Sequence, residues 1–217
     1  MHESYDYGLW LLVLINVMIF TIFTFAFIKP SKKYEWRSLG VFAAFIVALF
    51  TEMYGFPLTI YFLVSFFGDK IGIVDPFVHL NGHLLGTLFG ASAFLKYSIC
   101  LLGGIIMWLG ALTIYNGWRL IHGAKGNLVT TGIYSKIRHP QYSGIFLLSI
   151  GMLIQWPTLL TILMFPILIF AYYRLAKREE KDIEAEFSVE YKLYKEGVPA
   201  FIPKLKNHFK MTEGVKL

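Results

Sequence analysis

The residues best suited to chemistry lie in one short polar stretch, residues 132–142, which reads Gly-Ile-Tyr-Ser-Lys-Ile-Arg-His-Pro-Gln-Tyr. Gly132 permits a tight turn. Pro140, directly after Arg138 and His139, suits the first position of a helix because its fixed φ is already helical. The N–H groups at such a helix start favour an anionic partner such as a carboxylate. A basic loop facing lipid head groups explains the same residues, and both interpretations stay open.

A second charged cluster begins at Arg174 and includes Glu179 and Glu180. Charge runs on helices are most often solvated faces with weak pairs. This run, however, follows an apolar stretch, residues 143–173, that is too long for one membrane helix and is interrupted by Gln155-Trp156-Pro157. A turn there brings the chain back, so we expect the two clusters to lie close together. They suit a zwitterionic, amino-acid-bearing ligand, with Arg or His facing its carboxylate and Glu its amine or ribose hydroxyls.

The composition indicates that these residues are positioned by an integral membrane protein. The chain has 217 residues, of which 56% are hydrophobic and 16% are charged, whereas soluble domains carry about 25% charged residues. The single cysteine, Cys100, excludes a disulfide framework and a multi-cysteine metal site. A net charge of +6 marks the cytoplasmic loops of a membrane protein more often than a nucleic-acid site. We therefore expect the membrane bilayer, and no nucleic acid, as a partner.

Apolar runs predict an all-α membrane fold with about five transmembrane helices, since a helix of about 20 residues crosses the bilayer. The runs are residues 8–28, 39–67, a span within 84–115, and the two short spans of a hairpin over 143–173. The second run is expected to kink at Gly55-Phe56-Pro57, and residues 68–83 are expected to connect it to the third span. From Arg174 the sequence predicts a cytosolic amphipathic helix to about Glu196.

The distribution of lysine and arginine predicts an outside N-terminus and a cytoplasmic C-terminus. With five spans, all but two of the 20 Lys and Arg residues fall on one side, which is the cytoplasmic side by the positive-inside rule. Glu3 and Asp6 fit the outside. We divide the chain into residues 1–125, transmembrane helices that form the substrate side, and residues 126–217, a cofactor-binding region with the hairpin and the tail.

The C-terminal region resembles the isoprenylcysteine carboxyl methyltransferase and phospholipid methyltransferase family, an integral membrane methyltransferase group. The resemblance covers about residues 126–204. It rests on Gly-x-Tyr followed by Arg-His-Pro-x-Tyr, a helical hairpin, Arg174 followed by Glu179-Glu180, and then Glu186-Phe187, Glu190-Tyr191, Tyr194, Val198-Pro199 and Pro203. Where relatives often have Phe-Gly, this chain has Phe187-Ser188.

The resemblance implies an enzyme that uses S-adenosylmethionine, bound at the membrane–cytosol face. The residues assigned to this cofactor are Gly132, Tyr134, Arg138, His139, Tyr142 and Glu180. Arg174 and Glu179 match the arginine and glutamate that the family places near the transferring methyl group, so they are the candidate catalytic residues. The acceptor is expected to be a small apolar or lipidic molecule. A prenylated cysteine, a phospholipid amine, a small thiol and a quinone-like molecule all stay open.

Glu52 is an ionisable residue in the middle of an apolar run. Such residues are costly in a membrane and are functional candidates by default, so we assign Glu52 to the substrate cavity. A structural hydrogen bond to a neighbouring helix is the alternative. His79 and His83 are four residues apart, a spacing that suits a metal on a helix. No third ligand is nearby in the sequence, so no metal is expected.

Two other functions stay open. Sterol reductases are similar over the same C-terminal segment and use a nicotinamide cofactor, which makes an NADPH-dependent membrane reductase the first alternative. Such reductases are typically longer, with more spans. The second alternative is a small non-enzymatic transporter or sensor built around Glu52 and the two histidines, although no inverted repeat supports it. The sequence predicts no oligomeric state.

Overall fold

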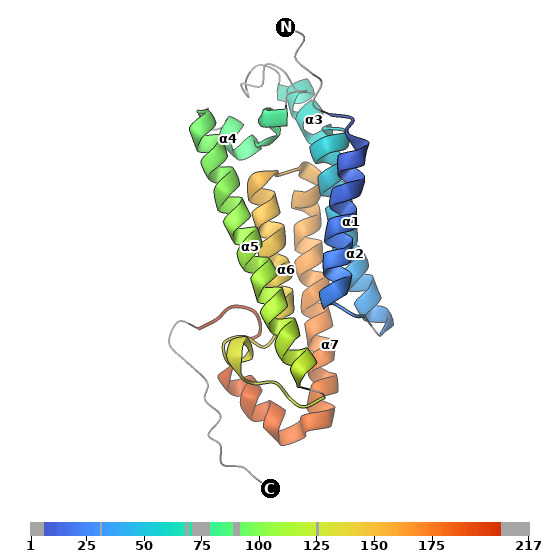
Figure 1. Ribbon diagram of the computed structural model, residues 1–217, viewed down its shortest axis with the longest axis vertical. Helices are drawn as coiled ribbons and strands as arrows, with labels where there is room; N and C mark the ends of the chain where they lie inside the picture. Colours follow the sequence, from blue (N-terminus) through green and yellow to red (C-terminus); the bar gives the residue numbers. More distant parts are fainter. Residues whose placement is uncertain are drawn as a thin grey trace. The chain divides into compact units, whose positions relative to one another are not determined.

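The computed structural model consists of helices joined by short connections (Figure 1). It describes residues 7–30, 32–67, 70, 79–88, 92–124 and 126–204. Within these ranges every regular element is helical and no strand is present, so the predicted all-α fold is confirmed. Glu3, Asp6 and most of the predicted connection over residues 68–83 lie outside the described residues.

The first helices contain the predicted kink. Helix α1 spans Trp10–Phe27 and helix α2 spans Lys33–Phe50. A π-helical turn, Thr51–Gly55, then leads to helix α3, Leu58–Phe67. The break falls at Phe56, whose backbone is extended with φ −134°, because a residue before proline is disfavoured in the helical region.

The second half of the chain contains the predicted hairpin. A short helix α4, Leu84–Leu88, precedes the long helix α5, Ala93–Gly123. Helix α6, Pro140–Gln155, and helix α7, Leu159–Gly197, are separated at Trp156-Pro157, as predicted. The predicted apolar run ends at Tyr115, but helix α5 continues to Gly123. The polar residues after Tyr115 are therefore helical as well.

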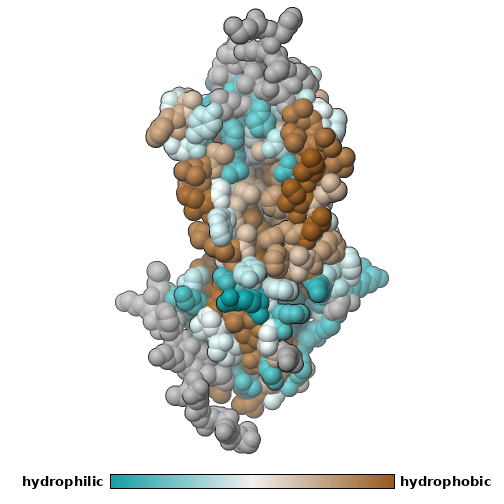
Figure 2. Space-filling view, in the orientation of Figure 1, coloured by the Kyte–Doolittle hydropathy of each residue, from teal (hydrophilic) through white to brown (hydrophobic). Residues whose placement is uncertain are grey.

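Among the described residues, four helical segments are long and apolar enough to cross a membrane: α1, α2 with its π-helical turn, α5 and α7. Helix α6 has 16 residues, fewer than the roughly 20 of a typical span, so the fifth span stays a prediction. In α7 charged residues begin at Arg174, which ends its apolar part. Hydrophobic side chains cover much of the surface over the helices (Figure 2), as expected where lipid is the solvent.

The chain forms two compact units. Unit 1 comprises Met1–Met107 and Ser149–Ala171, and unit 2 comprises Trp108–Leu148 and Tyr172–Leu217. Each unit contains a part of α5 and a part of α6. In both units these two helices pack closely, because glycines let their backbones approach. A Cβ on Gly103 would lie 2.7 Å from the carbonyl oxygen of Gly151 in unit 1. A Cβ on Gly110 would lie 2.7 Å from the carbonyl oxygen of Gly144 in unit 2.

Candidate cofactor pocket and its charged support

The polar stretch that precedes α6 begins with a tight turn. Gly132–Ser135 form one 3₁₀ turn. Gly132 has φ +61°, a left-handed conformation that glycine adopts at no steric cost. A Cβ there would also lie 2.8 Å from Leu120 Cδ1. The Tyr194 hydroxyl of α7 donates to the carbonyl oxygen of Tyr134 at 2.6 Å, which holds the turn against α7.

Arg138 is a buried cation whose donors all point to α7 and the segment after it. Its Nε and Nη2 donate to Glu180 Oε1 at 3.1 and 2.7 Å. Its Nη1 donates to the carbonyl oxygens of Lys195, at 3.0 Å, and Val198. A guanidinium suits this site because its rigid fork serves several acceptors at once. Arg138 therefore fastens the start of α6 to both halves of the charged part of α7.

The backbone strengthens the same connection. The N–H groups of Arg138 and His139 donate to the carbonyl oxygens of Pro199 and Ala200, each at 2.9 Å. These N–H groups precede α6 and have no partner within it. The segment after α7 supplies the acceptors that a ligand carboxylate would otherwise offer. The expected anion site at this helix start is thus partly filled by the chain itself.

Glu180 is the centre of the ion-pair network. Its side chain is only 2% exposed, and Oε1 lies 3.2 Å from His139 Nε2. Its Oε2 accepts a hydrogen bond from Lys177 Nζ at 3.1 Å and lies 3.8 Å from Lys195 Nζ. Burial alone would raise the pKa of the Glu180 carboxyl, but hydrogen bonds from His139 and Arg138 outweigh it and hold this pKa below its usual value. Glu180 is therefore a fixed negative charge.

His139 is held in its neutral form. Burial lowers its pKa, and the charges of Arg138 and Lys177 add to this, against the opposing effect of Glu180. Because Glu180 is an acceptor, we assign the ring proton to Nε2. Nδ1 is then an acceptor, and it lies 3.9 Å from Glu179 Oε2.

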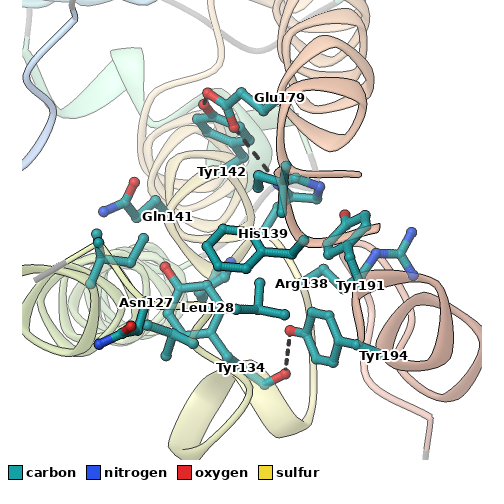
Figure 3. A pocket seen from close by; sticks show the side chains of 16 residues that line it. Asn127, Leu128, Tyr134, Arg138, His139, Gln141, Tyr142, Glu179, Tyr191 and Tyr194 are labelled. Atoms are coloured by element: carbon teal, nitrogen blue, oxygen red, sulfur yellow. Dashed lines mark hydrogen bonds and ion pairs between the residues drawn. The ribbon is translucent and has the colours of Figure 1, made fainter. Parts of the chain in front are cut away.

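A pocket of about 270 Å³ opens beside this network within unit 2 (Figure 3). Tyr142 and Glu179 lie at one end and Tyr134 and Tyr194 at the other. The Tyr142 hydroxyl donates to Glu179 Oε1. Aromatic rings form much of the wall: Tyr134, His139, Tyr142, Phe187, Tyr191 and Tyr194. Of the residues that line it, Glu179 is the one carboxylate.

The structure brings most of the predicted C-terminal residues to this pocket. Those that line it are Tyr134, Arg138, His139, Tyr142 and Glu179. Glu180 does not line the pocket but supports Arg138 and His139 from behind. Gly132 shapes the turn and does not line the pocket either. Arg174 is exposed on α7 and is not among the lining residues.

Glu52 belongs to unit 1, in the π-helical turn, and is 5% exposed. Its Oε2 accepts a hydrogen bond from the Thr59 N–H at 2.9 Å. Its Oε1 is buried and has no hydrogen-bond partner in the described part of the chain. A structural hydrogen bond therefore accounts for one carboxylate oxygen only. π-Helical turns are frequent at functional sites, and the assignment of Glu52 to a substrate cavity stays a prediction.

His79 and His83 pack against aromatic rings. The His79 ring centroid lies 4.4 Å from that of Trp156 and 5.5 Å from that of Tyr54. His83 Nδ1 lies 2.8 Å from the carbonyl oxygen of Gln155. Over the described ranges, no group of three or more His, Cys, Asp and Glu side chains is placed to hold a metal.

Several pocket residues were missed by the sequence reasoning. Asn127 and Gln141 line the wall with amide groups, and no pattern in the sequence singles them out. Tyr191 and Tyr194 belong to the family resemblance, which assigns them no role. Residues three apart share one face of a helix. Two tyrosines at this spacing in an otherwise charged helix therefore predict that this face of the helix is buried.

Comparison with known proteins relates the pocket region to a family. The model of the isoprenylcysteine carboxyl methyltransferase (ICMT) family matches residues 94–185. A curated relative, protein-S-isoprenylcysteine O-methyltransferase of Schizosaccharomyces pombe (strain 972 / ATCC 24843), is 31% identical over 77 residues, which are 35% of this chain and 33% of the relative. The chain thus matches about a third of that relative's length. No solved structure matches the chain significantly. The predicted resemblance is confirmed in that residues 94–185 match the model of the isoprenylcysteine carboxyl methyltransferase family.

Proposed function

We propose that this chain is a multi-pass membrane enzyme that transfers the methyl group of S-adenosylmethionine to a small apolar or lipidic acceptor at the membrane–cytosol boundary. The observation that carries the proposal is the pocket where Tyr142, Glu179 and His139 meet. All three lie within residues 94–185, the part that matches the methyltransferase family. The predicted orientation, with the C-terminus in the cytoplasm, gives this pocket access to a water-soluble cofactor.

The chemistry of the pocket fits S-adenosylmethionine. Glu179, whose side chain is 28% exposed, presents a carboxylate to an ammonium or sulfonium group, and Tyr142 fixes it. The aromatic wall offers ring faces to an adenine and to a cation. The Tyr172 hydroxyl is buried and has no partner in the described chain, and its ring lies 5.1 Å from that of Tyr142. A buried hydroxyl of this kind calls for a polar partner, which a ligand would supply.

The size of the pocket sets how the cofactor is held. Pockets for small molecules usually measure about 300–1,000 Å³, and this one, at about 270 Å³, is slightly smaller. We therefore expect part of the ligand to stay exposed when it is bound. Asn127 and Gln141 suit the polar edges of a nucleoside, because amides both donate and accept hydrogen bonds.

Methyl transfer needs little covalent chemistry from the protein. The cofactor supplies an electrophilic methyl group. The protein must align the acceptor with that group and exclude water. We assign Glu179 to position an amine or take up a proton, and Arg174 to orient an anionic acceptor. Glu180 keeps its charge but is shielded by Arg138 and Lys177, so it holds the site together and does not react.

The acceptor is selected by the N-terminal helices in this proposal. Residues 1–93 lie outside the region that matches the family, and residues 1–125 form the predicted substrate side. Glu52, with one unpartnered oxygen in the described chain, is the proposed substrate residue. An apolar acceptor would enter sideways from the bilayer.

Labelled methyl transfer tests the proposal. We would incubate the purified chain with methyl-labelled S-adenosylmethionine and a lipid extract of the host, and identify the product by mass spectrometry. Arg174→Ala should abolish transfer and leave cofactor affinity nearly unchanged, and Arg178→Ala, an exposed arginine one turn away, is the matched control. His139→Ala should weaken cofactor binding. Full transfer by Arg174→Ala would remove Arg174 from the catalytic site, and no labelled product would contradict the proposal.

A further inference from the structure

Unit 1 holds a second pocket, of about 190 Å³, between the second half of α1 and residues 36–46 of α2. The two helices lie side by side in Figure 1. Its wall is almost wholly apolar. Phe20, Phe25 and Trp36 contribute rings. Of its two threonines, Thr24 already donates its hydroxyl to the carbonyl oxygen of Phe20, at 2.6 Å. The pocket therefore suits a hydrocarbon chain and offers little to a polar ligand.

Gly40 gives the pocket its room. A Cβ built on Gly40 meets no atom within 4 Å. The rings of Phe25 and Trp36 lie 5.7 Å apart at the edge, and Trp36 is 52% exposed. The pocket thus opens to the surroundings of the helices, which in a membrane are lipid chains.

Positive charge gathers at one end of this pocket. Lys29 and Lys32 lie in the connection between α1 and α2, and Lys33 and Arg37 lie in the first turns of α2. Lys33 and Arg37 share a face of α2 with Gly40, because residues three and four apart are neighbours on a helix. Long helical side chains lean toward the N-terminus, so both cations gather where α2 begins.

Cations outnumber acids in this segment, residues 29–40. Glu35 is the acid of this segment, and its carboxylate accepts a hydrogen bond from the Lys32 N–H at 3.2 Å. The start of α2 adds a partial positive charge from the helix dipole. An apolar pocket close in the sequence to four cations, none of which lines it, matches a molecule with a hydrocarbon chain and an anionic head.

We propose that this pocket binds one acyl chain of an anionic phospholipid, with the lipid phosphate held by the cations at the start of α2. Charge distinguishes this occupant from a zwitterionic phospholipid, which offers the same chain without a net charge to meet the cations. The inference does not depend on methyl transfer, because α1 and α2 lie outside residues 94–185.

Native mass spectrometry of the full chain in detergent tests the proposal, with phosphatidylglycerol and phosphatidylcholine of identical acyl chains as probes. We expect phosphatidylglycerol to be retained about tenfold more strongly, a difference of about 1.4 kcal/mol. Gly40→Phe should remove most of this retention. Gly123→Phe is the matched control, because a Cβ on Gly123 also meets no atom within 4 Å but Gly123 does not line the pocket.

A charge variant separates the head group from the chain. Lys33→Gln with Arg37→Gln should reduce binding of phosphatidylglycerol to the level of phosphatidylcholine and leave phosphatidylcholine unchanged. Gly40→Leu serves if Gly40→Phe does not fold. Equal retention of the two lipids by the unmodified chain would overturn the anionic assignment. Equal retention by Gly40→Phe and Gly123→Phe would overturn the assignment to this pocket.

Discussion

Each of the two units buries a glutamate, and the two glutamates differ in how many partners surround the carboxylate. Glu180 of unit 2 is surrounded by cations and donors, among them Arg138, His139 and Lys177. Glu52 of unit 1 accepts one hydrogen bond, from the Thr59 N–H, and its second oxygen has no partner among the described residues. A fully paired carboxylate fixes the elements around it. A buried oxygen without a partner is costly, which is why we propose Glu52 as the residue that contacts the substrate.

The largest effect expected from this comparison follows from unpairing Glu180. Glu180→Gln leaves Arg138 buried without a counter-charge, and breaking a buried ion pair in this way typically costs about 3–5 kcal/mol. We expect a loss of that size in the free energy of unfolding, measured by chemical denaturation in detergent. Glu186→Gln, an exposed site on the same helix, is the control. A loss below about 1 kcal/mol would show that Glu180 does not hold unit 2 together.

Glu52→Gln probes the other side of the comparison. A glutamine still accepts the Thr59 N–H, so we expect the free energy of unfolding to change by less than about 1 kcal/mol. If the second oxygen contacts the acceptor, the KM for the acceptor rises about tenfold, or about 1.4 kcal/mol. The Kd for S-adenosylmethionine should not change. Steady-state kinetics with the acceptor that the labelled-transfer experiment identifies provide the measurement, and an unaltered KM would make Glu52 a structural residue.

Acid should weaken unit 2 in two stages. The folded-state pKa of His139 lies below its ordinary 6.5 and that of Glu180 below its ordinary 4.5. The unfolded chain therefore binds more protons, and stability falls first below about pH 6.5 and again below about pH 4.5. One proton limits each slope to about 1.4 kcal/mol per pH unit. His139→Gln should remove the first fall in a series of thermal unfolding curves, and an unchanged series would contradict the assignment.

Ser188 offers the smallest effect. It has φ 22° and ψ −94° within α7, a sparsely populated backbone conformation that costs a residue with a Cβ on the order of 1 kcal/mol. The kink lies between Glu180 and Lys195, the two α7 residues that Arg138 contacts. Ser188→Gly should raise the free energy of unfolding by about 1 kcal/mol, and Ser188→Ala, which keeps the Cβ, should not. Destabilisation by glycine would show that the kink is not strained.

The breaks between helices were predictable from the sequence, and the helix lengths less so. Pro57 and Pro157 mark breaks because proline lacks an N–H and restricts the residue before it. The end of α5 at Gly123 was not predictable from hydropathy, because Asn116 and Arg119 are polar yet helical. The helix continues beyond its apolar residues because its backbone hydrogen bonds do not require apolar side chains. A hydropathy pattern therefore does not reveal where it ends.

The meeting of the two charged clusters was also predictable, because a hairpin must return the chain to its start. The division of roles between Glu179 and Glu180 was not. Adjacent residues point about 100° apart on a helix, so one faces the pocket and the other faces Arg138. The sequence does not specify that rotation. In the structure the ion pairs of Glu180 with Arg138 and Lys177, and the hydrogen bond that Glu179 accepts from Tyr142, hold the helix in this rotation.

The central claim is that the pocket of unit 2 binds S-adenosylmethionine. Isothermal titration calorimetry of the purified chain with S-adenosylmethionine, S-adenosylhomocysteine and NADPH tests it most directly. We predict that both sulfur ligands bind with Kd values on the order of 1 μM, about 8 kcal/mol of binding free energy, and that NADPH does not bind. Binding of NADPH without either sulfur ligand would contradict this account in favour of a reductase, and binding of none of the three would contradict an enzyme of either kind.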